Sequence, residues 1–150
     1  MKAKTIFPIL LTLATAGAAT SAALAHGGVQ NQAVLARMDA MKAIGDATKV
    51  LGEMAKGATA FDAAAAQAAA AEIAAHAAET PALFAAPETD PKSEALPGIW
   101  EDFADFTAKA SALEARADTL ASGLETPDDL NAGLGQLGEA CTACHKAYRE

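Results

Sequence analysis

The sequence contains no pattern from which a β-sheet could be built. No stretch alternates apolar and polar residues with the two-residue period of a strand. Aromatic residues make up only 5% of the chain, whereas alanine, the residue with the highest helix propensity, is abundant throughout. A β-rich fold is therefore excluded, and the composition predicts an all-α protein.

Cysteine is almost absent. The two cysteines, Cys141 and Cys144, stand three positions apart near the C-terminus. A disulfide framework staples segments that are distant in the sequence, which this pair cannot do. Hydrophobic residues make up 52% of the chain, so a core can form without such cross-links. We therefore expect the two thiols to serve chemistry.

The N-terminal region has the features of an export signal. Lys2 and Lys4 precede an apolar stretch and then small residues that end in the triplet Ala-Leu-Ala at Ala25, which fits the rule for signal peptidase. The alternative is an uncleaved anchor, but a membrane span needs about 20 apolar residues and this stretch is shorter and interrupted. We predict a cleaved signal peptide at residues 1–25, a single domain at residues 26–150 and a periplasmic location.

Basic residues are too few to balance the acidic ones. The full chain carries 11 Lys and Arg against 19 Asp and Glu, and loss of Lys2 and Lys4 with the signal makes the net charge −10. Such a chain repels nucleic acid and anionic membrane surfaces, so we expect neither as a partner. Redox partner proteins are expected to present basic docking surfaces. No further segment is apolar enough to cross a bilayer, so the mature chain is expected not to insert into a membrane.

Four helices account for the rest of the chain. They are predicted at residues 31–56, 62–78, 99–121 and 127–148. The second is expected to end before Pro81. The third has a first cap at Asp90 and an internal break at Pro97, and the fourth begins with Thr126 as its cap. The first and third links between these helices are short and the second is longer. This order predicts an antiparallel four-helix bundle.

Apolar residues recur in steps of four and three along the last two helices. The third helix carries Ile99, Phe103, Phe106, Ala110, Leu113, Ala117 and Leu120 at this spacing, and the fourth carries Leu130, Leu134, Leu137, Cys141, Cys144 and Tyr148. This spacing is typical of a seam that packs against neighbouring helices. Both cysteines are therefore expected on the core-facing side of the fourth helix.

The segment Cys141-Thr142-Ala143-Cys144-His145 is the most specific motif in the chain. The pattern C-x-x-C-H is typical of covalent haem attachment. On a helix these two cysteines and the histidine occupy positions i, i+3 and i+4 of one face. Each thiol can then add across one of the two vinyl groups of a haem, and the imidazole can reach the iron. We predict one haem c, held through two thioethers and ligated by His145.

Two other roles for the motif fit its setting poorly. A redox-active dithiol normally lies at the start of a helix after a strand, where the helix dipole lowers the thiol pKa. This pair lies near the end of a helix in a chain without strands. A zinc site takes four ligands, and only His26 and His76 remain as distant imidazoles.

The predicted mature chain resembles the cytochrome c prime family, the class II c-type cytochromes. The segments that carry the resemblance are Arg37-x-x-x-Met41, Leu51-Gly52-x-x-Ala55-Lys56-Gly57, Phe61-Asp62-x-Ala64-Ala65, Pro81-Ala82-Leu83-Phe84, Ile99-Trp100 and Gly138-x-x-Cys141-x-x-Cys144-His145-x-x-Tyr148-Arg149. A haem motif near the C-terminus is itself typical of this family, because class I cytochromes carry it near the N-terminus. The resemblance implies a four-helix bundle with one covalently bound haem.

The same resemblance leaves two functions open. In low-spin members a methionine of the first helix closes the sixth position of the iron, and Met41 matches that place, with Met38 one turn earlier as the alternative. In high-spin members the iron keeps five ligands, and some of these proteins bind nitric oxide or carbon monoxide. We favour ligation by Met41 and a function in electron transport. A haem enzyme is not expected, because no histidine or carboxylate except Asp39 lies near Met41 in the sequence.

Two further expectations come from the resemblance. Arg37 is expected to pair with a haem propionate, since a charge-assisted hydrogen bond to a carboxylate is favourable. The alternative is an ordinary surface arginine. Family members are often dimers through their first two helices, and the alanine-rich faces of this chain permit a homodimer.

Overall fold

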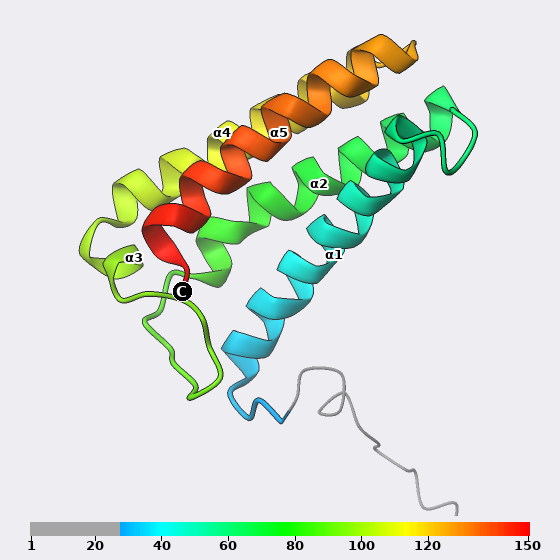
Figure 1. Ribbon diagram of the computed structural model, residues 1–150. Coiled ribbons are helices and arrows are strands. Elements are labelled where there is room, and N and C mark those ends of the chain that lie inside the picture. The colour runs from blue at the N-terminus through cyan, green and yellow to red at the C-terminus, as the bar shows by residue number, and fades with distance from the viewer. Residues whose placement is uncertain (1–27) are drawn as a thin grey trace, which may run out of the picture.

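The computed structural model describes residues 28–150, and these form an all-α bundle (Figure 1). The helices are α1 (Gln32–Ala55), α2 (Ala63–Leu83), α3 (Gly98–Glu101), α4 (Phe103–Gly123) and α5 (Pro127–Tyr148). None of them is long and apolar enough to span a membrane. The predicted signal peptide at residues 1–25 lies outside the described residues.

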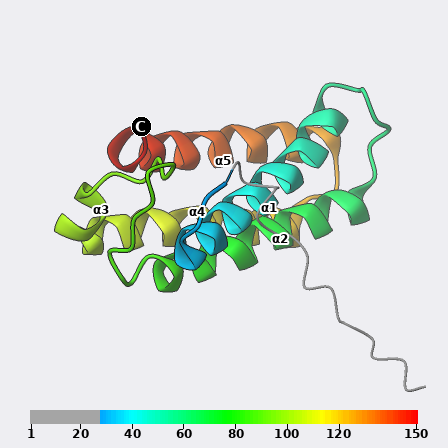
Figure 2. The same ribbon diagram turned by 90° about the horizontal axis from the view of Figure 1, so that it is seen from below.

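The four long helices run antiparallel in chain order. α1 packs on α2, α2 on α4 and α4 on α5, whereas α1 and α5 touch over only a small part of their length. Figures 1 and 2 show α5 lying along α4, with the C-terminus beside the short α3. The predicted antiparallel four-helix bundle is confirmed, and its least tightly packed edge lies between the first and last helices.

Polar side chains fix where the long helices begin. The Asn31 side chain accepts hydrogen bonds from the first free backbone N–H groups of α1, and Asp62 does the same for α2. At the start of α5, Thr126 and Asp129 form a reciprocal capping box, followed by a first-turn proline. The start predicted for the last helix is therefore confirmed.

The second helix is longer than predicted. It continues through Pro81 and ends at Leu83, although a proline removes one backbone donor and disfavours the helical conformation of the residue before it. Thr80 is buried and its hydroxyl donates to the carbonyl of His76, while the carbonyl of Leu83 accepts a hydrogen bond from Arg37. Tertiary contacts therefore hold the last turn despite the proline.

The start predicted for the third helix at Asp90 is wrong. The Asp90 carboxylate instead accepts hydrogen bonds from the backbone N–H groups of Gln30 and Asn31, just before α1. Pro97 introduces the short α3, and the break in the rod falls at Asp102. The Asp102 side chain accepts from the N–H of Asp105 and so caps α4.

Apolar side chains fill the bundle in two main clusters. The larger cluster lies among the four long helices and includes Ile44, Leu51, Ile73, Ala117, Leu120, Leu130 and Leu137. The second lies at the end of the bundle near the C-terminus and consists of Phe84, Ile99, Phe106 and Tyr148 with their partly buried neighbours. The predicted seam of the third helix faces these clusters, with Phe103 and Leu113 partly exposed.

Candidate functional site

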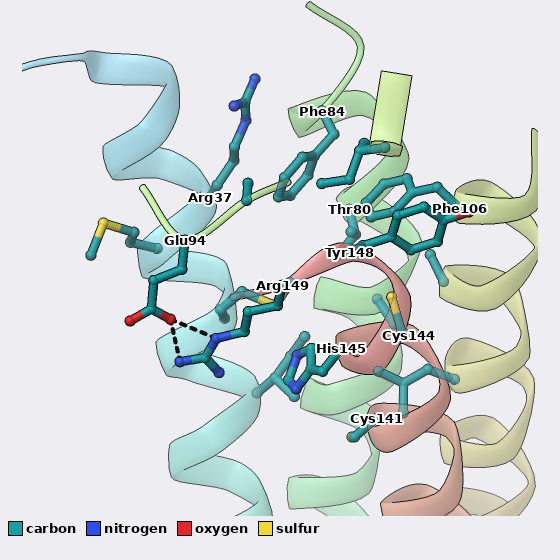
Figure 3. A pocket seen from close by; sticks show the side chains of 18 of the residues that line it. Arg37, Thr80, Phe84, Glu94, Phe106, Cys141, Cys144, His145, Tyr148 and Arg149 are labelled. Atoms are coloured by element: carbon teal, nitrogen blue, oxygen red, sulfur yellow. Dashed lines mark hydrogen bonds and ion pairs between the residues drawn. The ribbon is translucent and has the colours of Figure 1, made fainter. Parts of the chain in front are cut away.

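A cavity of 650 Å³ opens between the first and last helices (Figure 3). Its walls are residues 34–48 of α1 and residues 140–149 at the end of the chain, and parts of α2, α4 and the connection at residues 92–95 complete it. Most of the lining side chains are apolar. Sites that bury a cofactor have this size and this predominantly apolar lining.

All five residues predicted for the site line this one cavity. They are Arg37, Met41, Cys141, Cys144 and His145. The first two come from α1 and the other three from α5, which lie more than 95 positions apart in the sequence. Figure 3 shows the His145 imidazole projecting from α5 toward α1. The fold therefore brings together the two segments that the sequence singled out.

The thiols of Cys141 and Cys144 are free and half-buried, one helical turn apart. Burial raises the pKa of both thiols. A redox-active dithiol needs the opposite, a lowered pKa that supplies thiolate at neutral pH. The environment of the pair therefore does not favour disulfide exchange.

His145 is held in a state suited to metal binding. Burial lowers its pKa, and the nearby positive charge of Arg149 lowers it further, while Glu94 acts in the opposite direction. The imidazole is therefore neutral at pH 7, and the neutral form is the one that offers a nitrogen lone pair to a metal. Within residues 28–150 no group of three or more His, Cys, Asp or Glu side chains is arranged to hold a metal ion by itself.

Two methionines of α1 face the cavity. Met38 and Met41 both line it and both are partly buried. Met54, further along the same helix, is buried in the main apolar cluster and lies outside the cavity lining. The cavity therefore has two thioether sulfurs available on the helix that faces His145.

Arg37 is not the surface arginine of the alternative expectation, because it is only 3% exposed. Its guanidinium donates hydrogen bonds to the carbonyls of Leu83, Ala86 and Glu88 at 2.9, 2.6 and 2.7 Å. It also stacks over the ring of Phe84 at 4.6 Å. Burial lowers its pKa, and Glu88 partly opposes this effect. Two of the five N–H donors remain, so pairing with a propionate stays a prediction.

The connection between α2 and α3 closes one end of the cavity. Its residues pair with the end of the chain: the Leu96 N–H donates to the Tyr148 carbonyl and the Glu150 N–H to the Glu94 carbonyl, both at 3.0 Å. The Arg149 guanidinium bonds the Glu94 carboxylate at 2.6 Å (Figure 3). The sequence did not point to Glu94, because no local pattern around either residue indicates that the two will pair.

An aromatic cluster supports the cavity beside the cysteines. The Phe106 ring lies 5.0 Å from Phe84 and 5.5 Å from Tyr148. The Tyr148 hydroxyl donates to the Asp105 carboxylate at 2.6 Å, and the Trp100 indole N–H donates to the Phe84 carbonyl at 2.7 Å. The polar ends of these side chains are thus satisfied while their rings remain apolar packing surface.

These residues fit a covalently bound haem. A haem brings a broad apolar ring, two vinyl groups and an iron, and the cavity offers an apolar lining, two thiols one turn apart and a neutral imidazole beside them. An all-α bundle with a C-x-x-C-H segment on the wall of such a cavity defines a c-type haem protein.

The chain belongs to the cytochrome c′ family. The family's sequence model, described as Cytochrome C', matches residues 32–149. A cytochrome c-556 from Agrobacterium tumefaciens (strain apple 185) is 40% identical over 129 residues, which is 83% of this chain and 97% of that protein. A cytochrome c-554 from Cereibacter sphaeroides (strain ATCC 17023) is 38% identical over 106 residues, 67% of this chain and 69% of that protein.

The solved structure of cytochrome c' from Rhodopseudomonas palustris is similar throughout the described bundle. It superposes with a TM-score of 0.75 at 34% sequence identity, covering 81% of this chain and 98% of that chain. The fold class and the resemblance inferred from the sequence are therefore confirmed. So is the cofactor, since the C-terminal Cys141 and Cys144 pair is consistent with the covalent haem c of this family. Proteins of the family are haem proteins and not enzymes, as expected.

Proposed function

We propose that this protein is a periplasmic monohaem electron carrier in which His145 and Met41 would ligate the haem iron. Thioethers to Cys141 and Cys144 hold the haem, and Arg37 pairs with one of its propionates. The observation that carries the proposal is that these five side chains, from opposite ends of the chain, line one cavity. Several relatives are named cytochrome c-556 or c-554, as low-spin members of the family are, and this supports closed coordination.

The haem, when bound, supplies an iron that cycles between two oxidation states. Side chains of the protein would supply the ligands of the iron and the surroundings of the haem. His145 would offer a neutral nitrogen from the end of α5, and Met41 a sulfur from α1. The aromatic cluster and the apolar lining would shield the face of the haem that they contact from water, and two ligands from separate helices would restrict movement between the two states.

Gas binding is the second candidate function. It requires a five-coordinate iron, and the observation that favours it is the loose edge of the bundle, where α1 and α5 touch over only a short length. A methionine on α1 can move away from the iron more easily where the two helices are not tightly packed. In that case Met41 would shield an open face without binding the iron.

The absorption spectrum of the reduced protein, with and without carbon monoxide, separates the two functions. A sharp low-spin spectrum that the gas leaves unchanged supports the carrier. Rapid formation of a carbon monoxide adduct in the wild type contradicts ligation by Met41. Met41→Ala should convert the low-spin protein into one that binds the gas. Met38→Ala, on the same wall of the cavity, is the matched control and should leave the spectrum unchanged.

Export is tested on its own. We propose that residues 1–25 direct the chain to the periplasm and are removed there. The mature protein recovered from the periplasmic fraction should begin at His26. A protein that retains its N-terminal residues and stays with the membrane fraction would contradict the proposal.

A further inference from the structure

Gly45 stands in the middle of a long helix, where glycine is unfavourable. It lies in α1 between Met41 and Thr48, one helical turn from each. Glycine has a low helix propensity, because it loses more conformational freedom than any other residue when the helix forms. Such a position calls for a reason in its surroundings: either a close neighbour leaves no room for a side chain, or the position admits another group.

Packing against a neighbouring helix does not explain this glycine. Apart from its chain neighbours and the nearby backbone of α1, no heavy atom of residues 28–150 lies within 4 Å of a Cβ placed on Gly45. Gly133 on α5 is the contrasting case, because a Cβ there would lie 2.4 Å from a methyl carbon of Leu120. The close neighbour that accounts for Gly133 is therefore missing at Gly45.

The space beside Gly45 belongs to the cavity of the candidate site. Gly45 is exposed and lines this cavity on the α1 side, together with Met41 and Thr48. The end of α5 forms another wall, from which the His145 imidazole projects toward α1 (Figure 3). Gly45 therefore faces the site of the cofactor and not a neighbouring helix.

A haem accounts for the missing side chain at this place. Attached at Cys141 and Cys144, it would occupy the cavity that Gly45 lines. Gly45 follows Met41 by four residues, about 6 Å along the helix axis. The haem ring is much broader than its iron, so a ring whose iron lies opposite Met41 also extends toward Gly45. Because glycine has no Cβ, it is the residue that lets a backbone approach a bound group closely.

We propose that Gly45 is a positioning residue, whose missing side chain lets α1 lie close to the face of the haem. A larger side chain at this position would hold α1 away from the ring, and the sulfur of Met41 with it. The proposal rests on the proposed function, because it places the haem in this cavity with Met41 facing the iron.

Gly45→Leu tests the proposal, and Gly52→Leu is its matched control. Both glycines lie on α1, seven residues apart, and a Cβ on either meets nothing within 4 Å. Only Gly45 lines the cavity. Leucine is a good helix former, so neither substitution weakens the helix by itself. Gly45→Ala and Gly52→Ala form a second, milder pair. All four variants are made in the full chain and purified with the haem attached.

The absorption spectrum, with and without carbon monoxide, and the Tm are measured for each haem-containing variant. We expect Gly45→Leu to shift the equilibrium between bound and released Met41 about ten-fold or more toward release, because overpacking at the haem face opposes ligation. A high-spin spectrum and a carbon monoxide adduct report this shift. Tm should fall by about 4–12 °C. Gly52→Leu should keep the wild-type spectrum and a Tm no lower than that of the wild type.

The outcomes separate this proposal from the proposed function. If the wild type itself binds carbon monoxide rapidly, ligation by Met41 is contradicted; Gly45→Leu should then slow formation of the adduct, because its side chain fills space on the α1 side of the haem. If the Gly45 and Gly52 variants have the same spectra, gas binding and Tm, the role of Gly45 is contradicted and electron carriage is not. If Gly45→Leu yields no haem protein, the two alanine variants decide by the same comparison.

Discussion

Arg37 has a structural role that can be tested apart from any role toward the haem. Its guanidinium ties α1 to the end of α2 and to the connection that follows, through hydrogen bonds to the carbonyls of Leu83, Ala86 and Glu88. Arg37→Met keeps much of the apolar stem and removes every donor. We expect this variant to be markedly less stable than the wild type, because three carbonyls lose a charged partner at once.

The size of the loss follows from these contacts. A hydrogen bond from a charged donor contributes about 1.5–3 kcal/mol. Ala86 and Glu88 are exposed residues, so their carbonyls can bond water in the variant, and removal of a buried charge recovers some desolvation energy. The net loss should be about 3 kcal/mol in the free energy of unfolding. For a domain of this size that lowers Tm by about 12 °C.

Thermal and urea unfolding of the haem-containing protein measure this loss. Covalent attachment keeps the haem on the chain, so its release does not complicate the transition. Arg116→Met is the control: Arg116 is 37% exposed and donates to the Gln136 carbonyl, so its loss should be below about 1 kcal/mol. Equal losses for the two variants would refute the reasoning. Arg37→Lys keeps the positive charge but lacks the planar guanidinium whose N–H groups reach three carbonyls at once, so it should recover little of the lost stability.

Two further predictions concern α4 and α5. A Cβ at Gly133 would lie 2.4 Å from a methyl carbon of the buried Leu120, so Gly133→Ala should cost about 1–2 kcal/mol in unfolding free energy; Gly135→Ala, which meets nothing within 4 Å, should gain up to about 1 kcal/mol in urea titration. The hydrogen bond to Asp105 raises the pKa of Tyr148 to about 12. The folded state therefore binds the phenol proton more tightly than the unfolded state. The contribution of this hydrogen bond to the stability of the folded protein is complete below the ordinary pKa of about 10 and is lost as the pH rises through about 12. Tyr148 is the one tyrosine of the chain, so its tyrosinate band in ultraviolet resonance Raman spectra reports this midpoint, and a wild-type midpoint near the ordinary value would contradict the contact.

The helices and their antiparallel order were predictable because their signals are local. Caps, first-turn prolines and apolar residues at helical spacing lie within a few positions of one another, and Thr126 with Asp129 is an example. The errors fell where a distant residue supplied the deciding contact. α2 passes through Pro81 with its end carbonyl bound to Arg37, and Asp90 accepts from the N–H groups before α1.

The residues of the site also fall into those that local patterns predict and those that depend on contacts between distant segments. The motif from Cys141 to His145 could be recognised because its residues share one face of one helix, and Met41 and Arg37 entered through a resemblance carried by short segments. Glu94 could not be predicted, since its pairing with Arg149 spans 55 positions and depends on how the connection folds back. Such contacts have no periodicity that a sequence can display.

The sequence by itself determined the chemistry of attachment, because two thiols and an imidazole at helical spacing need only one helix to share a face. It also determined the helical class and the number of long helices. The tertiary structure alone decided which charges surround the site. Net charge is a sum that ignores position, whereas a screened electrostatic interaction depends on distance. For that reason net charge did not predict that Arg149 and Glu94, 55 positions apart, would form an ion pair at the wall of the cavity.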